Sequence, residues 1–373
     1  MFVLNDVEKN LVNYKNLADN GSIDHQENLG VYYWLKFDLD NAEKYLELAA
    51  NGGSVSAMVM LAELYVNPPE YQLDQIEAMR EAFINDEFEN FDFDDGFNVE
   101  EFEKKKEKAE NWIEEAAKNG DHYSMHDLAV RYRDLPKGKK LALEWCLKSA
   151  ELGNVFAQND IGAHYEHGKG IGRNNKLAFE WYMKAAIQGE PTAMYNIGQC
   201  YRIGRGVKEN QEKAFEWYVK AAQKGDGCAQ NEVAIYYDEG IVVSKNPYEA
   251  YNWFRRGAIS GDKNAKYSLA NCYHKGIGTK IDYEKAFILF YELATLPEPY
   301  TLAYNKLAIF FFEGLGVKEN KKQAILWFKK GANSNEPYSM LNLAECYENG
   351  DGVIKDLEKA EKLRKKAEQF LSE

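Results

Sequence analysis

The residues of this 373-residue chain that could hold a metal ion are its six histidines, four of which form two close pairs. His122 and His126 are four residues apart, and His164 and His167 are three apart, so each pair could share one helix face. A zinc site needs further ligands at defined spacing, and neither pair has a cysteine or a third ligand there. We therefore expect no metal site, and we predict a packing role for His164.

Motifs that mark a catalytic or cofactor site do not occur in the sequence. It contains no Gly-x-Ser-x-Gly, no Walker-type phosphate loop and no His-Glu-x-x-His. Gly-x-Gly pairs occur, among them five that begin at Gly168, Gly204, Gly276, Gly314 and Gly350, but none of these follows the strand that a dinucleotide site needs, so we interpret them as turns. We expect no catalytic residue, no cofactor and no enzymatic activity.

Three of the five cysteines, Cys200, Cys272 and Cys346, each stand directly before a tyrosine. This regular placement indicates small buried core residues and not disulfide partners. The first residues, MFVLNDVEKN, lack the basic region of a secretory signal, and no apolar run approaches the roughly 18 residues that span a bilayer. With no Cys-x-x-Cys either, we expect a cytoplasmic protein that does not associate with membranes.

Residues 86–103 combine nine acidic residues with five phenylalanines and contain no lysine or arginine. Acidic groups attract a basic surface, and phenylalanines anchor in pockets, so this segment is one candidate for partner binding. The candidate binding residues here are Phe88, Phe91, Asp92, Phe93, Asp94, Asp95 and Phe97.

Two other interpretations of residues 86–103 stay open. The phenylalanines could pack as a structural flap on the rest of the protein. The segment also places six residues at positions like those of a calcium-binding EF-hand loop: Asn90, Asp92, Asp94, Phe97, Asn98 and Glu101. The sixth position of such a loop needs glycine, and here it is Asp95, so calcium binding is the weakest of the three.

The net charge of −14 is concentrated in the N-terminal part of the chain. Residues 1–103 hold 23 acidic and 5 basic residues, whereas the remainder holds 37 acidic and 41 basic. A strongly acidic surface argues against nucleic acid as a ligand, because phosphate binding requires a basic footprint. It favours a basic protein partner, although a charged solubilising surface is an equally good explanation.

The elements that must position these residues are two alternating kinds of helix. The first kind reads A-x-x-x-L-G-x-x-Y, as in 193–201, and ends at Gly-x-Gly. The second kind reads K-A-x-x-W-x-x-x-A-A-x-x-G and recurs every 36 residues in the clearest copies. Its key alanines are Ala109, Ala142, Ala178, Ala214, Ala250, Ala286, Ala324 and Ala360.

A fixed period of this kind predicts stacked helix pairs, because one pair cannot bury its apolar face alone. We count nine pairs after one lone helix. The large residue three positions after each key alanine, mostly tryptophan, is predicted to fill the core between pairs. The Asn or Asp four positions before that alanine is predicted to cap the second helix: Asn174, Asn210, Asn246, Asp282, Asn320 and Asp356.

Residues 193–225 resemble the Sel-one-like repeat (SLR) family, a branch of the tetratricopeptide-repeat superfamily, almost position by position. The resemblance extends over 27–370 and implies an all-α, right-handed superhelical solenoid of about nine repeats. It also implies a scaffold or adaptor that binds other proteins, with the first helices on the concave side. We therefore predict an N-terminal capping helix in 1–26 and a single solenoid domain over 27–370, with an insertion at 67–103.

The residues predicted to line the concave side lie three before, one after and four after the Gly or Ala of each first helix. Binding to a partner and bridging between adjacent helices are equally good explanations for them. The candidates are Asn159, Tyr195, Gln199, Arg202, Asn231, Tyr267, Asn271, His274 and Asn305.

Together these observations predict a non-catalytic module that binds a protein partner. One specific hypothesis is a cytoplasmic immunity-type inhibitor of a basic toxin. The alternative is an adaptor in a secretion, envelope or regulatory complex. Some copies depart from the repeat pattern, notably IVVSKNP in 226–261 and the short linker RDLPKGKK in 121–153. These could present partner-specific loops, and neutral variation of the loops is an equally good explanation.

Overall fold

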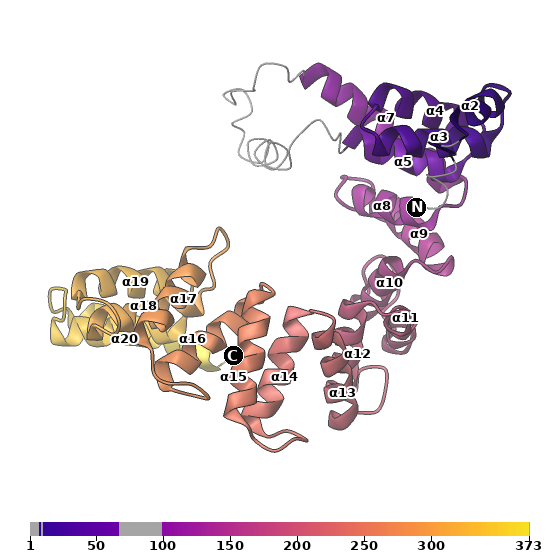
Figure 1. The fold of residues 1–373 in the computed structure, drawn as a ribbon. Helices are drawn as coiled ribbons and strands as arrows, with labels where there is room; N and C mark the ends of the chain where they lie inside the picture. The colour runs from indigo at the N-terminus through magenta and orange to yellow at the C-terminus, as the bar shows by residue number, and fades with distance from the viewer. Residues whose placement is uncertain (1–6, 9, 67–98, 373) are drawn as a thin grey trace. The chain divides into compact units, whose positions relative to one another are not determined.

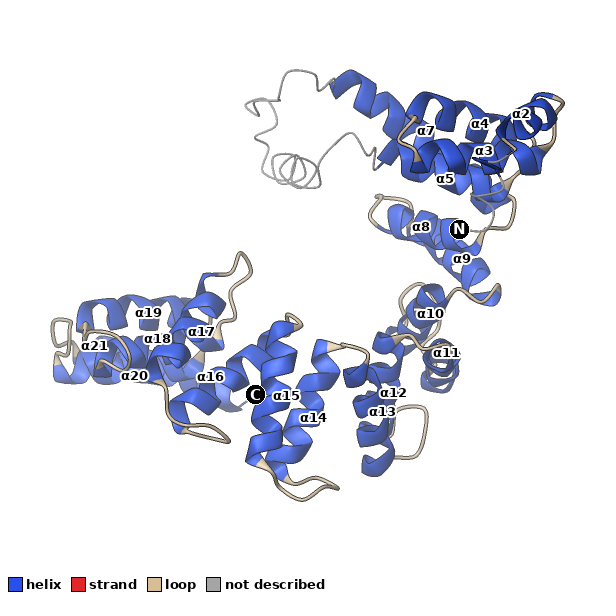
Figure 2. Ribbon diagram, in the orientation of Figure 1, coloured by secondary structure: helices blue, strands red, loops and turns tan. Residues whose placement is uncertain are grey.

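The computed structural model describes residues 7–8, 10–66 and 99–372, and these residues form nineteen α-helices and no strand (Figure 1, Figure 2). The predicted all-α repeat fold is confirmed. The helices agree in number and order with the predicted lone helix, here α2, followed by eighteen helices that alternate between the first and the second kind. Residues 67–98, which hold most of the predicted insertion and most of the acidic segment, lie outside the described residues.

The chain divides into two compact units, Met1–Arg173 and Asn174–Glu373. The prediction of a single domain over 27–370 stays a prediction, and each unit is described by itself. In unit 1 each helix packs against the next one along the chain. Its helices are α2 (Leu11–Asp19), α3 (Ile23–Leu35), α4 (Leu39–Asn51), α5 (Val55–Val66), α7 (Val99–Lys118), α8 (His122–Arg133), α9 (Lys139–Glu151) and α10 (Val155–His167).

Unit 2 has the same neighbour-to-neighbour packing, and its first helices α14 and α16 also contact each other, as do α18 and α20. Its helices are α11 (Asn175–Ile187), α12 (Pro191–Ile203), α13 (Gln211–Gln223), α14 (Gly227–Glu239), α15 (Pro247–Ile259), α16 (Lys263–Lys275), α17 (Tyr283–Thr295), α18 (Leu302–Glu313), α19 (Lys321–Asn333), α20 (Pro337–Asn349) and α21 (Leu357–Ser372).

The eight key alanines of the second helices are all buried, as predicted. The tryptophans beside them contribute to the core, but most are less completely buried than predicted. Trp181 and Trp217 are only half-buried, and the next residue, Tyr182 or Tyr218, is the one that is almost fully buried. The reason is the helix geometry, since one step of about 100° turns the following side chain directly into the stack. Trp327 is buried and is the exception.

The glycines that follow the first helices confirm the turn interpretation. Gly168, Gly204 and Gly276 end their helices in the left-handed conformation, which costs glycine little. The second glycine of the pair has an additional role. A Cβ on Gly206 would lie 2.0 Å from the backbone oxygen of Asn175, so this glycine lets the loop after α12 lie close against the start of the preceding second helix, α11.

Two local features differ from the expected pattern. Helix α7 begins at Val99, five residues before the expected start near Lys104. The residues in between include Glu100, Glu101 and Glu103, which are good helix formers and favourable near a helix N-terminus. In the copy without Gly-x-Gly, Val242 takes the place of the second glycine and has a positive φ of 52°.

Candidate partner-binding surfaces

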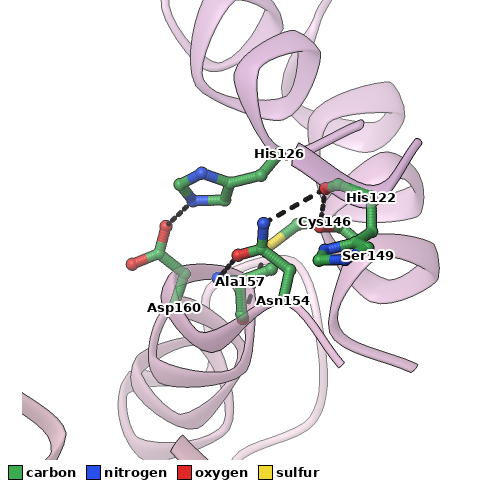
Figure 3. Close-up of polar contacts among 7 residues, drawn as sticks. All are labelled: His122, His126, Cys146, Ser149, Asn154, Ala157 and Asp160. Carbon is green, nitrogen blue, oxygen red and sulfur yellow. Dashed lines mark hydrogen bonds and ion pairs between the residues drawn. The ribbon is translucent and has the colours of Figure 1, made fainter. Parts of the chain in front are cut away.

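The histidines of the two pairs lie in different surroundings. In α8, His126 Nε2 lies 3.0 Å from Asp160 Oδ2 on α10, and Figure 3 shows the two side chains facing each other. The His122 ring instead contacts Tyr123, and its Nδ1 is buried without a hydrogen-bond partner. Among the residues that the structure describes, no group of three metal-ligating side chains comes together.

The backbone of His122 joins α8 to the next repeat (Figure 3). Its carbonyl oxygen accepts hydrogen bonds from Ser149 Oγ at 2.5 Å and from Asn154 Nδ2 at 3.2 Å. Asn154 also caps α10, because its Oδ1 accepts from the backbone N–H of Ala157 at 2.9 Å. One buried amide thus serves both as a helix cap and as a bridge between repeats.

Three of the predicted binding residues meet on α12 in unit 2. Gln199 Nε2 donates to the hydroxyl of Tyr195 at 2.8 Å. Arg202 donates from Nε and Nη2 to Gln199 Oε1, at 3.1 and 2.6 Å. All three side chains are half-buried, so each keeps a part exposed while its position is fixed by the others.

The α12 group extends to the next first helix through Glu232 of α14. Gln199 Nε2 lies 3.5 Å from Glu232 Oε1. Burial raises the pKa of Glu232, and the positive charge of Arg202 opposes that shift. Burial also raises the pKa of Tyr195 to about 12, so its hydroxyl stays protonated and can donate. We call these four residues, Tyr195, Gln199, Arg202 and Glu232, the α12–α14 cluster.

Further along unit 2, aromatic packing surrounds the candidates on α16. The Tyr267 ring lies 5.5 Å from that of Phe290 and 5.4 Å from that of Tyr300. Asn271 Nδ2 donates to the backbone oxygen of Tyr267 at 3.0 Å, within its own helix.

His274 packs edge-on against Phe310 at 5.1 Å, and its Nδ1 is buried without a hydrogen-bond partner. Burial, together with the positive charges of Lys306 and Lys275, lowers the pKa of His274.

The asparagine candidates have different surroundings. Asn305 Oδ1 accepts from Asn342 Nδ2 of the next first helix at 2.7 Å, so it bridges helices. Asn231 is buried, with 7% of its surface exposed. Asn159 is half-buried on α10 in unit 1, whereas the other concave-side candidates belong to unit 2. Bridging, which the sequence left as an alternative, therefore describes Asn305 and Gln199, while Tyr195, Arg202 and Tyr267 keep exposed surface.

Comparison with known proteins agrees with this geometry. A family model described as Sel1 repeat matches nine segments: 26–54, 101–121, 122–154, 155–190, 191–226, 229–262, 263–297, 301–336 and 337–368. This chain belongs to the Sel1 repeat family. No curated protein matched the sequence.

Two solved structures show the same Sel1 repeat fold. A Sel1 repeat protein from Oxalobacter formigenes is 30% identical, with a TM-score of 0.57, and the match covers 65% of this chain and 96% of that one. The protein c5321, a protective antigen present in uropathogenic Escherichia coli strains and displaying an SLR fold, is 25% identical, with a TM-score of 0.63. That match covers 96% of this chain and 79% of that one.

The Sel1 register also identifies residues of unit 1 that sequence reasoning did not select. Ala129 of α8 occupies the position of Gly198 of α12. The offsets that point to Tyr195, Gln199 and Arg202 therefore point to His126, Val130 and Arg133 in α8. The signal was present in the sequence, but the irregular linker that follows α8 obscured the alignment of this repeat.

The remaining sequence candidates have the following positions. His164 is half-buried, and its Nδ1 lies 2.6 Å from the backbone oxygen of Lys169, so it anchors the loop after α10. The candidates in the acidic segment, Phe88 to Phe97, lie outside the described residues. No helix of the described residues is both long and apolar enough to cross a membrane.

The repeat-position cysteines are buried, as predicted. Burial raises the pKa of the Cys200 and Cys272 thiols to about 12, and that of Cys346 to about 11, so these thiols stay protonated. Cys228 is exposed, but it donates to Asp262 Oδ2 at 3.5 Å and its pKa is also raised to about 12. All five cysteines are free.

Proposed function

We propose that this Sel1 repeat protein is a non-catalytic binding module that holds a segment of a protein partner on the α12–α14 cluster. Sel1 repeat proteins mediate protein–protein interactions. The observation that carries the proposal is the hydrogen-bonded arrangement of Tyr195, Gln199 and Arg202, whose half-buried side chains each keep an exposed part.

The chemistry of the cluster fits protein recognition. Tyrosine and arginine are enriched among the residues that contribute most to binding at protein interfaces. Ordering a long arginine side chain on binding normally costs about 0.5–1.5 kcal/mol. Because two hydrogen bonds already hold the Arg202 guanidinium, part of that cost is met before the partner arrives.

Capture of the partner from the native cell with the tagged full chain tests this proposal. The variant Tyr195→Ala/Arg202→Ala should lose about 2 kcal/mol or more of binding, roughly thirtyfold in affinity. The matched control is Tyr248→Ala/Arg255→Ala, which removes the same residue types from exposed positions on the second helix α15. Equal retention of the partner by both variants would rule out the α12–α14 cluster as the binding surface.

A more specific form of the proposal is a cytoplasmic immunity-type inhibitor that binds a basic toxin. The concentration of acidic residues in 1–103 supports it, because complementary charge accelerates association with a basic protein. The alternative is a scaffold in a secretion, envelope or regulatory complex. One stoichiometric basic partner in the capture experiment supports inhibition, whereas several partners of one complex support the scaffold.

A further inference from the structure

Unit 1 contains a cavity of about 630 Å³ between α8, α9 and α10. Its apolar wall comes from Ala129, Val130, Ala142, Cys146 and Ala163. Its charged lining comes from all three elements and the loop after α10, and comprises Arg133, Lys139, Asp160 and Lys169. The cavity therefore combines a small apolar surface with an excess of positive charge.

The positive groups of this cavity have little internal compensation. Asp160, the carboxylate in the lining, is engaged by His126 at 3.0 Å. Among the described residues, Arg133 forms an ion pair only with the exposed carboxylate of Asp134, at 3.6 Å. Within the part of the chain that the structure describes, Lys139 and Lys169 form no ion pair. An added anion would thus find unpaired donors.

Two departures from the repeat pattern bring Lys139 and Lys169 to the cavity. The short linker before α9 brings Lys139 to the first position of that helix, directly after Gly138. Helix α9 has no acidic residue in its first turn and no side chain capping it, so its N-terminus also favours a negative charge. His164, which stands where other repeats have cysteine, holds the loop of Lys169 through the backbone oxygen of that residue.

We propose that this cavity binds the carboxylate side chain of a glutamate or aspartate in a peptide segment of a protein partner. The carboxylate lies among Lys139, Lys169 and Arg133, and the aliphatic part of the segment lies on Ala129, Val130 and Ala163. The inference rests on the proposed protein-binding function, but it concerns a different surface from the α12–α14 cluster.

The lining favours a peptide over a nucleic acid. Binding of single-stranded nucleic acid typically uses aromatic side chains on which bases stack, and the residues that line this cavity include none apart from the imidazole of His164. The carboxylate of Asp160 would repel a chain of successive phosphates. A single carboxylate can bind the positive side chains of the lining, and an apolar group next to it can pack on the alanines and the valine.

The test uses the full chain and an array of fluorescein-labelled 12-residue peptides that each contain two glutamates, with a matched array in which both are glutamine. We expect a subset of the glutamate peptides to bind about tenfold or more tightly than their glutamine counterparts, a difference of about 1.4 kcal/mol. The variant Lys139→Gln/Lys169→Gln should abolish this preference.

Two controls separate this result from other causes. Lys137→Gln/Lys140→Gln removes the same charge from exposed positions outside the cavity lining and should keep the preference. Tyr195→Ala/Arg202→Ala should also keep the preference for glutamate peptides. A failure of the proposal for the α12–α14 cluster can therefore be told apart from a failure of the proposal for the cavity.

Three outcomes would overturn the inference: no glutamate peptide binds below about 1 mM, both lysine variants lose binding equally, or single-stranded oligonucleotides bind this cavity more tightly than any peptide.

Discussion

Trp181 and Trp217 lie at the edge of the helix stack, and each has a lysine over its ring. Lys184 Nζ lies 3.6 Å from the centre of the Trp181 ring, and Lys220 Nζ lies 4.2 Å from that of Trp217. A cation over an exposed aromatic ring contributes about 0.5–1 kcal/mol. The spacing of Trp and Lys in the repeat motif therefore places a lysine over the tryptophan ring at the edge of the stack. The tyrosine directly after the tryptophan fills the interior.

His274 of unit 2 has surroundings that disfavour its protonation. Its ring packs against Phe310 and Tyr283, and Lys306 and Lys275 contribute positive charge nearby. Because its pKa in the folded protein lies below the ordinary value of 6.5, the unfolded chain takes up a proton first as the pH falls. The stability contributed by this site is present above pH 6.5 and is lost as the pH falls through that value toward the folded pKa.

Replacement of His274 by phenylalanine should remove this pH dependence while keeping the ring contacts. We expect the thermal midpoint of the wild-type chain to fall between about pH 7.5 and pH 5, and that of His274→Phe to fall less. Circular dichroism measures both. The control is His167→Asn, at an exposed position at the end of α10, which should behave like the wild type. An identical fall in His274→Phe and in the wild type would contradict the assignment.

At the scale of the element, both ends of most helices are specified by single residues. The predicted caps of the second helices are confirmed at all six positions, for example at Asn174, which accepts from the backbone N–H groups of Lys176 and Leu177. The first helices have caps that sequence reasoning did not identify. They stand directly after the glycine or asparagine that closes the preceding helix: Asp121, Asn154, Glu190, Asp226, Asp262 and Glu336.

Val242 is the clearest case of local strain in these elements. A β-branched residue at a positive φ costs on the order of 1–3 kcal/mol, and Val242 is 43% exposed, so little packing compensates. We expect Val242→Gly to stabilise the chain by about 1 kcal/mol, after allowance for the flexibility of glycine in the unfolded state. Urea unfolding measures the change.

The neighbouring position provides the control for Val242→Gly. Val243 has no positive φ, so Val243→Gly should destabilise the chain by up to about 1 kcal/mol. If Val242→Gly were as destabilising as Val243→Gly, the backbone at Val242 would not be strained.

The repeat period was sufficient to predict the helices, their pairing and the buried alanines, because these depend on a spacing that is visible in the chain. It could not show that the tryptophan is half-buried while the next residue is buried. That depends on how the helix is rotated about its own axis relative to the neighbouring repeat. It also could not show the reason for the second glycine, because the backbone oxygen that Gly206 approaches, that of Asn175, lies 31 residues earlier in the chain.

The candidate site was only partly accessible from the sequence. The register placed Tyr195, Gln199 and Arg202 on one face, and the structure joins them by hydrogen bonds. Their connection to Glu232 and the bridge from Asn305 to Asn342 depend on how adjacent first helices meet, which a pattern within one repeat does not contain. Binding at these residues stays a prediction.

At the scale of the whole molecule, the chain combines uniform repeats with unevenly distributed charge and irregular copies. Unit 1 has the cationic cavity next to α9, in the same half of the sequence as the acidic residues of 1–103. Unit 2 has the α12–α14 cluster on regular repeats. We infer that the regular repeats provide the scaffold and that binding specificity comes from the side chains that the repeat motif leaves variable.

Hydrogen–deuterium exchange of the full chain, with and without the captured partner, tests the protein-binding account most directly. Amides of a bound surface exchange more slowly because the partner stabilises them and excludes water. The account predicts slower exchange in the first helices α12 and α14, with little change in the second helices α13 and α15. Protection confined to the second helices, or no protection in unit 2 at saturating partner, would contradict it.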